Sequence, residues 1–205
     1  MKKITIACII TSLLAFNASA AENAISPYIS ARVGIGTGDS YAYMPKSLGY
    51  GFMGAVGAQY NNLEGINLRL ELEYSNFKFK DSDSYNDPPF DKYEASYNLD
   101  HALYLTNFYL EVFKDYKIKL YASIALGLAS FKEDLSDSTY FYGTDVTILS
   151  NKKRVGSSFA GGLATGISFN ITNNLASDVG GRCIEFGGNN KIRTCNATFG
   201  IRYNF

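Results

Sequence analysis

The sequence predicts an all-β fold, an eight-stranded antiparallel β-barrel that crosses a membrane. First, apolar and polar residues alternate with a period of two through much of the chain, as they do in strands with one apolar face. Second, the 205-residue chain is rich in Gly (19), Tyr (16) and Phe (14), and its aromatic residues favour strands. Third, after residue 20 no apolar run approaches the roughly eighteen residues that a membrane-spanning helix needs.

The composition excludes several other classes of protein. Lys plus Arg (19) balance Asp plus Glu (19), so the formal net charge is zero. A broadly basic nucleic-acid-binding protein would have an excess of cations, and a disordered chain would have few aromatic residues. The three cysteines are unevenly spaced and form neither a dense disulfide scaffold nor a CxxC zinc site. The length suits one domain, or two small ones at most.

The first twenty residues have the three parts of a secretory signal peptide. Lys2-Lys3 provides a positive start, a mostly apolar run follows from Ile4 to Phe16, and Ala18-Ser19-Ala20 supplies the small residues that a signal peptidase reads. We therefore expect a signal peptide over residues 1–20 and a barrel domain over residues 21–205. The alternative for the first segment is an uncleaved N-terminal membrane anchor.

Eight segments in the remaining chain carry the alternation of a strand. In Ile66–Tyr74, for example, every second residue is Ile, Leu or Tyr, and the residues between them are Asn, Arg or Glu. Residues 29–35, 118–128 and 197–205 alternate in the same way, with polar or small residues on the second face. The predicted strands are 27–37, 50–60, 66–80, 99–113, 118–132, 157–170, 175–186 and 192–205.

The connections between these segments alternate in length. Residues 61–65, 114–117 and 171–174 predict tight turns. Residues 38–49, 81–98 and 133–156 predict long loops rich in Asp, Ser and Tyr, and the last connection, 187–191, is shorter. Short turns at one end and long loops at the other are typical of outer-membrane barrels. This arrangement predicts that both termini lie in the periplasm.

The second face of the predicted strands combines glycines with charged residues, which suits the tight interior of an eight-stranded barrel. Lipid then covers the apolar face, and the sheet must close because a bilayer cannot satisfy backbone groups. Asp178 and Arg182 cannot reach each other along one strand, so we expect partners on adjacent strands. The inward charges are Arg32, Arg69, Glu71, Glu73, Asp178, Arg182 and Arg202. The narrow lumen favours a salt-bridge plug over the alternative, a gated ion path.

Aromatic residues gather where the predicted strands end, as in the interfacial girdles of membrane proteins. These residues are Tyr28, Tyr50, Tyr60, Tyr74, Phe113, Tyr203 and Phe205. They favour a membrane barrel over the alternative, a soluble periplasmic or secreted β-barrel.

Two cysteines in the last two predicted strands suggest a disulfide. If residues 187–191 form a five-residue hairpin loop, Phe186 faces Ile192 and Cys183 faces Cys195. Opposed residues on neighbouring strands have a Cα spacing that permits a disulfide, and the periplasm is oxidising. We expect a cross-strand bond near the outer rim. The alternative is two free thiols on a lipid-facing edge.

The ending Thr198–Phe205 (TFGIRYNF) and the segment Leu120–Gly127 (LYASIALG) resemble the small outer-membrane β-barrel family of Gram-negative bacteria, the opacity-type and outer-membrane-protein-A-type barrels. The resemblance covers residues 21–205 and implies a location in the outer membrane. It also implies that Phe199, Ile201, Tyr203 and Phe205 form the signal read by the barrel-assembly machinery. No segment follows Phe205, so we expect no peptidoglycan-binding domain. The family hosts adhesins, immune-evasion proteins, enzymes and transporters, so the resemblance does not select a function.

The sequence offers no candidate for catalysis, a metal or a cofactor. His101 is the only histidine and has no serine in the motif Asp100-His101-Ala102-Leu103, so we expect no enzyme. Asp81–Asp87 resembles a calcium loop but has Asn86 at its sixth position and Lys92 at its twelfth, where such loops need Gly and Glu. We interpret it as a solvated acidic segment.

The three long loops are the predicted binding surface. Tyr mixed with Ser, Asp, Asn and Gly is the composition of adaptable recognition surfaces, and Pro88-Pro89 would stiffen the second loop. The candidate binding residues are Tyr41, Tyr43, Tyr85, Phe90, Tyr93, Tyr97, Tyr140, Phe141, Tyr142, Lys152, Lys153 and Arg154. An alternative is that these loops are soluble caps whose aromatic residues pack on each other.

The sequence therefore predicts an outer-membrane surface protein that binds through its loops, such as an adhesin or host-interaction protein. Two alternatives remain, a narrow porin-like transporter for small apolar molecules and a purely structural envelope protein. The expected partners are outer-membrane lipid and lipopolysaccharide, the assembly machinery, and a host-cell receptor or glycan. Nucleic acid is not an expected partner.

Overall fold

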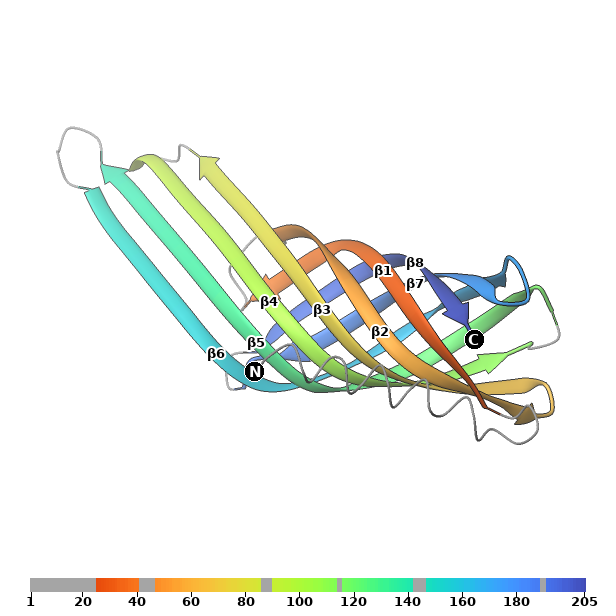
Figure 1. Ribbon diagram of the computed structural model, residues 1–205. Coiled ribbons are helices and arrows are strands. Elements are labelled where there is room, and N and C mark those ends of the chain that lie inside the picture. Colours follow the sequence, from red (N-terminus) through yellow and green to blue (C-terminus); the bar gives the residue numbers. More distant parts are fainter. Residues whose placement is uncertain (1–24, 41–46, 86–89, 114–115, 142–146, 189–190) are drawn as a thin grey trace.

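The computed structural model describes residues 25–40, 47–85, 90–113, 116–141, 147–188 and 191–205. These residues form eight β-strands in one closed barrel (Figure 1), which confirms the predicted fold. The strands are β1 (Ile25–Ser40), β2 (Ser47–Leu63), β3 (Ile66–Tyr85), β4 (Phe90–Val112), β5 (Ile118–Phe141), β6 (Thr147–Asn170), β7 (Leu175–Phe186) and β8 (Ile192–Asn204).

Each strand pairs antiparallel with the next strand in sequence, and β8 pairs with β1 to close the sheet. Closure gives the backbone N–H and C=O groups partners without water, as a bilayer requires. The short connections after β2, β4 and β6 lie at one end, which we call the turn end, and the C-terminus lies there too (Figure 1). We call the opposite end the wall end. None of the described residues forms a helix long and apolar enough to cross a membrane.

Two of the predicted long loops are wrong, because the structure continues most of residues 81–98 and 133–156 as strand. The pairing of β2 with β3 ends at Leu48 and Lys80, and the pairing of β7 with β6 ends at Phe186 and Ala160. Beyond these pairs β3–β6 continue as an open four-stranded sheet, the extended wall (Figure 1). On the outer face of this sheet polar residues replace the apolar residues of the closed barrel, and backbone pairing with the neighbouring strands holds the sheet together.

The outer face of the barrel below the extended wall is apolar. Large exposed residues on it include Ile29, Leu70, Ile124 and Leu163. Phe52, Tyr74 and Tyr104 form a chain of ring contacts, with centroids 6.1 and 5.3 Å apart. Of the predicted girdle residues, Tyr50, Tyr60, Tyr74, Phe113, Tyr203 and Phe205 are exposed.

Tyr28 corrects this part of the prediction, since its side chain is fully buried. It shares parity with Ser30 and Arg32, which are also buried. Because alternate residues of a strand point to the same face, the Tyr28 ring points into the barrel.

Glycines of β2 make room for two aromatic rings of β3. Gly51 is paired with Phe77 and Gly49 with Phe79. A methyl group at either glycine would overlap the facing ring. The rings therefore lie across the neighbouring strand and fill the barrel interior toward the wall end.

The predicted register of the last hairpin is confirmed. Phe186 pairs with Ile192, and Cys183 pairs with Cys195. The two cysteines are bonded, and their Cα atoms are 4.1 Å apart. The Cys183 side chain faces outward, so the bond links β7 and β8 on the outer surface of the barrel.

Candidate functional site

The barrel interior near the turn end holds buried charges of both signs. All seven predicted inward charges lie here, and Glu111 of β4 and Lys119 of β5 are two further buried charges. Four guanidinium groups therefore face four carboxylates, and each of the eight groups has at least one ion-pair partner. The arginines are Arg32, Arg69, Arg182 and Arg202, and the acids are Glu71, Glu73, Glu111 and Asp178.

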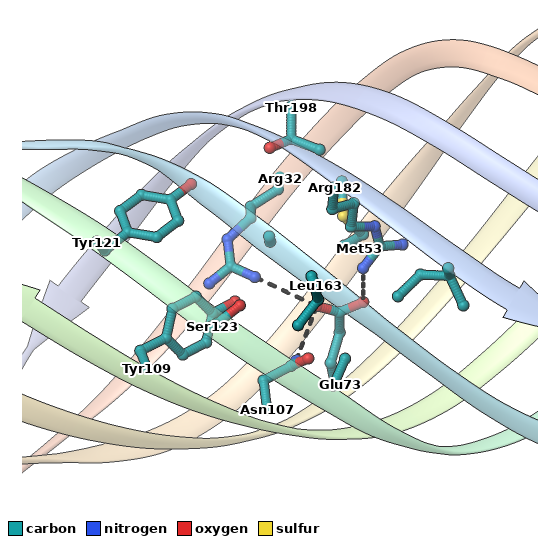
Figure 2. A pocket seen from close by; sticks show the side chains of 13 residues that line it. Arg32, Met53, Glu73, Asn107, Tyr109, Tyr121, Ser123, Leu163, Arg182 and Thr198 are labelled. Atoms are coloured by element: carbon teal, nitrogen blue, oxygen red, sulfur yellow. Dashed lines mark hydrogen bonds and ion pairs between the residues drawn. The ribbon is translucent and has the colours of Figure 1, made fainter.

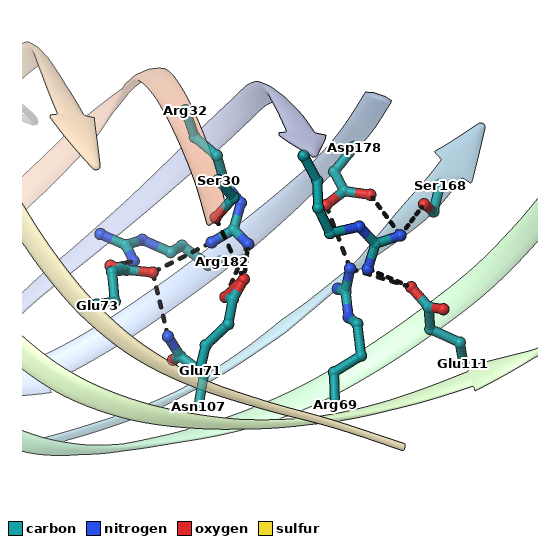
Figure 3. Close-up of polar contacts among 11 residues, drawn as sticks. Ser30, Arg32, Arg69, Glu71, Glu73, Asn107, Glu111, Ser168, Asp178 and Arg182 are labelled. Carbon is teal, nitrogen blue, oxygen red and sulfur yellow. Dashed lines mark hydrogen bonds and ion pairs between the residues drawn. The ribbon is translucent and has the colours of Figure 1, made fainter. Parts of the chain in front are cut away.

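Glu73 of β3 is the centre of one group of contacts (Figure 3). Its Oε2 lies 3.3 Å from Nη1 of Arg32 and accepts a hydrogen bond of 3.1 Å from Nδ2 of Asn107. Its Oε1 accepts a hydrogen bond from Nη1 of Arg182. Arg32 also pairs with Glu71. One carboxylate thus binds side chains from β1, β4 and β7.

Arg69 and Arg202 bind the other two acids, closer to the turn end (Figure 3). Nη1 of Arg69 lies 3.1 Å from Oε1 of Glu111 and 3.3 Å from Oδ2 of Asp178. Nη1 of Arg202 lies 3.3 Å from the same Glu111 oxygen, and Nη2 donates a 3.0 Å hydrogen bond to Ser168 Oγ. These contacts tie β3 to β7 and β4 to β8 across the lumen.

We expected Asp178 and Arg182 to form ion pairs with residues on adjacent strands. For their shortest ion pairs this expectation is wrong. Asp178 binds Arg69, and Arg182 binds Glu73, so both contacts run from β7 to β3 on the opposite side of the barrel. Arg202 on the adjacent strand β8 lies 3.9 Å from Asp178. The lumen of an eight-stranded barrel is narrow enough for long arginine side chains to cross it.

Tyrosine rings fill the space around the charges. The guanidinium carbon of Arg69 lies 4.2 Å from the ring centroid of Tyr109 and 5.9 Å from that of Tyr28, distances at which cation–π attraction operates. The cavity that Arg32, Glu73, Tyr109 and Arg182 help to line has a volume of about 20 Å³ (Figure 2). Such a volume holds about one water molecule. The lumen is therefore packed with side chains at this level.

Toward the wall end the interior becomes apolar. Fourteen buried residues form one cluster that includes Phe77, Phe79, Leu99 and Phe186. The His101 ring lies parallel to the rings of Phe77 and Phe79, with centroids 5.8 and 5.6 Å away. Neither ring nitrogen of His101 has a hydrogen-bond partner among the described residues. His101 is part of the packing of this layer.

Sequence reasoning missed Glu111 and the polar residues that support the charges. Glu111 and Asn107 lie in the predicted strand 99–113 and share the inward parity of Tyr109. Both residues therefore carry the alternation signal that identifies inward-facing side chains in the other strands. Ser30, Asn67 and Ser168 also bind members of the network, but a serine or asparagine alone gives no such signal.

The predicted binding residues lie in several different places. Tyr97 belongs to β4 and is only 3% exposed, so its placement in a binding loop is wrong. Lys152, Lys153 and Arg154 belong to β6, and both lysines are exposed. Five other candidates lie in strands, but their side chains are outside the described part of the structure: Tyr85, Phe90, Tyr93, Tyr140 and Phe141. Three candidates lie wholly outside the described residues: Tyr41, Tyr43 and Tyr142.

Above the aromatic contacts, the outer face of β3–β6 becomes polar. Lys78, Asp100 and Lys132 are neighbours across three strands, and all are exposed. Nearer the tip, serines of β3, β4 and β5 line a groove of about 350 Å³, among them Ser82, Ser96 and Ser136. Because a bilayer core excludes such surfaces, this part of the strands belongs in water.

Comparisons with known proteins agree with this architecture. The chain is similar to the crystal structure of Neisserial surface protein A, with 20% identity, coverage of 89% of this chain and 100% of that chain, and a TM-score of 0.53. It is also similar to Ail, the attachment invasion locus protein of Yersinia pestis, with 14% identity, coverage of 89% and 100%, and a TM-score of 0.48. No curated protein sequence matches significantly.

A family model described as the outer membrane protein beta-barrel domain matches residues 6–205. The match spans nearly the whole chain and agrees with the closed eight-stranded sheet and its apolar outer face. This protein therefore belongs to the β-barrel family of the Gram-negative outer membrane.

Proposed function

We propose that this protein acts at the cell surface by binding, as an adhesin or host-interaction protein, and that the extended wall and its tips carry the binding surface. The observation that supports this most strongly is the continuation of four strands beyond the closed barrel, with a polar outer face. A barrel that only had to close in lipid would not need this sheet. Five of the predicted aromatic binding residues lie at or near the ends of these strands, namely Tyr85, Phe90, Tyr93, Tyr140 and Phe141.

The proposal needs the wall end to face outward and the turn end, with both termini, to face the periplasm. Short periplasmic turns and longer external extensions are the usual arrangement in such barrels. Export would use the predicted signal peptide over residues 1–20, which lie outside the described part of the chain. Lipopolysaccharide would then surround the girdle, and the terminal residues Phe199–Phe205 would serve the assembly machinery.

The transporter alternative is less favoured by the packed interior. An apolar solute would have to pass the charge network, where the cavity is about 20 Å³, and also the apolar cluster around His101. Pocket volumes for small-molecule ligands are usually about 300–1,000 Å³. A purely structural envelope role fits the plugged lumen but leaves the extended wall unexplained. We also propose that the protein is not an enzyme.

Cell attachment tests the proposal through a trimmed variant. Asp81, Tyr97, Leu135 and Lys152 form one row of paired residues across β3–β6. Replacing residues 82–96 and 136–151 each by Asn-Gly keeps that row and closes it with two tight turns. A non-adherent bacterium that displays the full protein should attach to cultured cells, and the trimmed variant should lose most attachment while remaining folded in the outer membrane.

Two results would count against the proposal. Equal attachment by the trimmed variant would remove the wall tips from the binding surface. If neither form promotes attachment although both are folded and exported, the adhesin interpretation loses its support. Uptake of small apolar solutes into lipid vesicles would then test the transporter alternative.

A further inference from the structure

Strand β6 has an open edge along the extended wall. Its pairing with β7 covers Ala160–Asn170 and stops there, whereas its pairing with β5 continues to Thr147. Around the stop, Gly187 of the β7–β8 hairpin receives a hydrogen bond from Arg154 and donates one to Ser158. Beyond this contact, the described part of β6 has a strand neighbour on only one side. An edge of this kind is a template for an additional strand.

The hydrogen-bond pattern shows which residues point to the open side. The Asn170 N–H donates to Lys117 C=O, so this pair is bonded across β5 and β6. Antiparallel ladders alternate bonded and non-bonded pairs, and this one runs without a register shift. Even-numbered residues of β6 therefore bond to β5. Beyond the contact of Ser158 with the hairpin, the N–H and C=O groups of Asn151, Lys153 and Val155 point to the open edge.

The side chains along this edge favour an acidic partner. Lys152 and Lys153 are exposed, have no ion pair among the described residues, and lie on opposite faces of the strand. The other cations nearby have carboxylate partners, since Arg154 pairs with Glu133, and Lys191 and Arg193 share Glu185. Val155 is 75% exposed and offers an apolar contact to a side chain on an added strand.

We propose that the open edge of β6 binds an extended, acidic polypeptide segment of another protein, which adds to the sheet as a further strand. Main-chain hydrogen bonds to Asn151–Val155 provide the affinity, and Lys152 and Lys153 select the charge. This inference rests on the proposed function only in requiring the wall to face outward. It names a second binding mode, distinct from the wall tips.

Val155→Pro is the most direct test. It removes one edge-facing N–H and leaves the ladder to β5 intact, and proline is tolerated at such positions. The probe is a fluorescently labelled eight-residue peptide of alternating Glu and Thr, titrated by anisotropy into the full protein in phospholipid nanodiscs. We expect Val155→Pro to weaken binding about tenfold or more, while Val155→Thr, which keeps the N–H, changes it less than about twofold.

Charge reversal tests the acidic character of the partner. Lys152→Glu with Lys153→Glu should weaken peptide binding about tenfold, more strongly at low salt than at high salt. The matched control is Lys78→Glu with Lys80→Glu, which makes the same charge change on exposed residues of β3. A peptide with Lys in place of Glu should not bind the unmodified protein measurably.

Several outcomes would overturn the proposal. One is equal affinity of the protein for the peptide and for a version N-methylated at every residue, which has no main-chain N–H left to donate. This comparison needs no variant and decides the matter if Val155→Pro fails to fold. Another is self-association of the protein, lost in Val155→Pro, without peptide binding, since the edge would then serve a second copy. The trimmed variant keeps Lys152–Ser157. Loss of cell attachment in this variant therefore supports binding by the wall tips, and peptide binding tests the open edge separately.

Discussion

The strands β3–β6 have a lower part, which lies within the closed barrel, and an upper part, which is the extended wall. The two parts face different solvents. Within the barrel these strands turn apolar residues such as Leu70 and Ile124 outward and keep their charges inside. In the extended wall the outer face carries charges, such as Lys78 and Lys132. The lower part is closed by β1, β2, β7 and β8, and the upper part has open edges.

Lipid and water explain the difference. A bilayer leaves no backbone group unpaired, so the lower part must close, and the charges inside it must be paired because they are desolvated. Water satisfies the edge groups and screens the surface charges of the wall. Ion pairs in the barrel should therefore matter far more to stability than ion pairs on the wall, and this contrast can be tested.

The largest effect is expected at Glu73. Replacing it with alanine removes a carboxylate that binds Arg32, Arg182 and Asn107. Breaking a buried pair leaves an uncompensated charge, so Glu73→Ala should lower the free energy of unfolding by about 3–5 kcal/mol. Urea unfolding in lipid vesicles, followed by circular dichroism, measures this change.

The control replaces both partners of a pair. Glu73→Leu combined with Arg182→Met removes opposite charges together, and it should recover a large part of the stability lost in Glu73→Ala. A double variant less stable than Glu73→Ala would contradict the view that the unpaired guanidinium causes the loss.

The sequence was sufficient to predict the lower part and insufficient for the upper part. Strong alternation, as in Ile66–Tyr74, fixed strand type and face, and a five-residue loop fixed the register of Cys183 and Cys195. Around Ser82 both faces are polar, so alternation carries no signal, and the pairing that holds this part of the strands is a main-chain property. Contacts across the lumen, such as Arg182 with Glu73, depend on barrel geometry that local spacing does not contain.

A smaller effect, of opposite sign, is expected at His101. Its ring is buried beside the rings of Phe77 and Phe79, and its nitrogens have no hydrogen-bond partner among the described residues. Burying an unpaired polar group costs free energy. His101→Phe keeps an aromatic ring without that cost, so it should raise the free energy of unfolding by about 1 kcal/mol in the same urea assay.

The matched control is Phe77→His, which adds a second imidazole to the same apolar layer and should lower stability by about 1–3 kcal/mol. If His101→Phe destabilises the protein, the ring of His101 has a polar interaction that its surroundings do not reveal, or the layer is too tightly packed for the larger ring.

The smallest effect is expected for the ion pair between Lys132 and Asp134 on the outer face of β5. The Nζ–Oδ2 distance is 3.2 Å, comparable to the barrel pairs, but the two side chains are 56% and 25% exposed. Exposed pairs contribute about 0–1 kcal/mol, and salt screens them. A double-mutant cycle with Lys132→Ala and Asp134→Ala should give a coupling below about 0.5 kcal/mol that disappears at about 1 M salt. A coupling energy as large as the stability lost in Glu73→Ala, about 3–5 kcal/mol, would mean that the wall is not fully in water. Ion pairs at similar distances differ this much in energy only when their solvation differs.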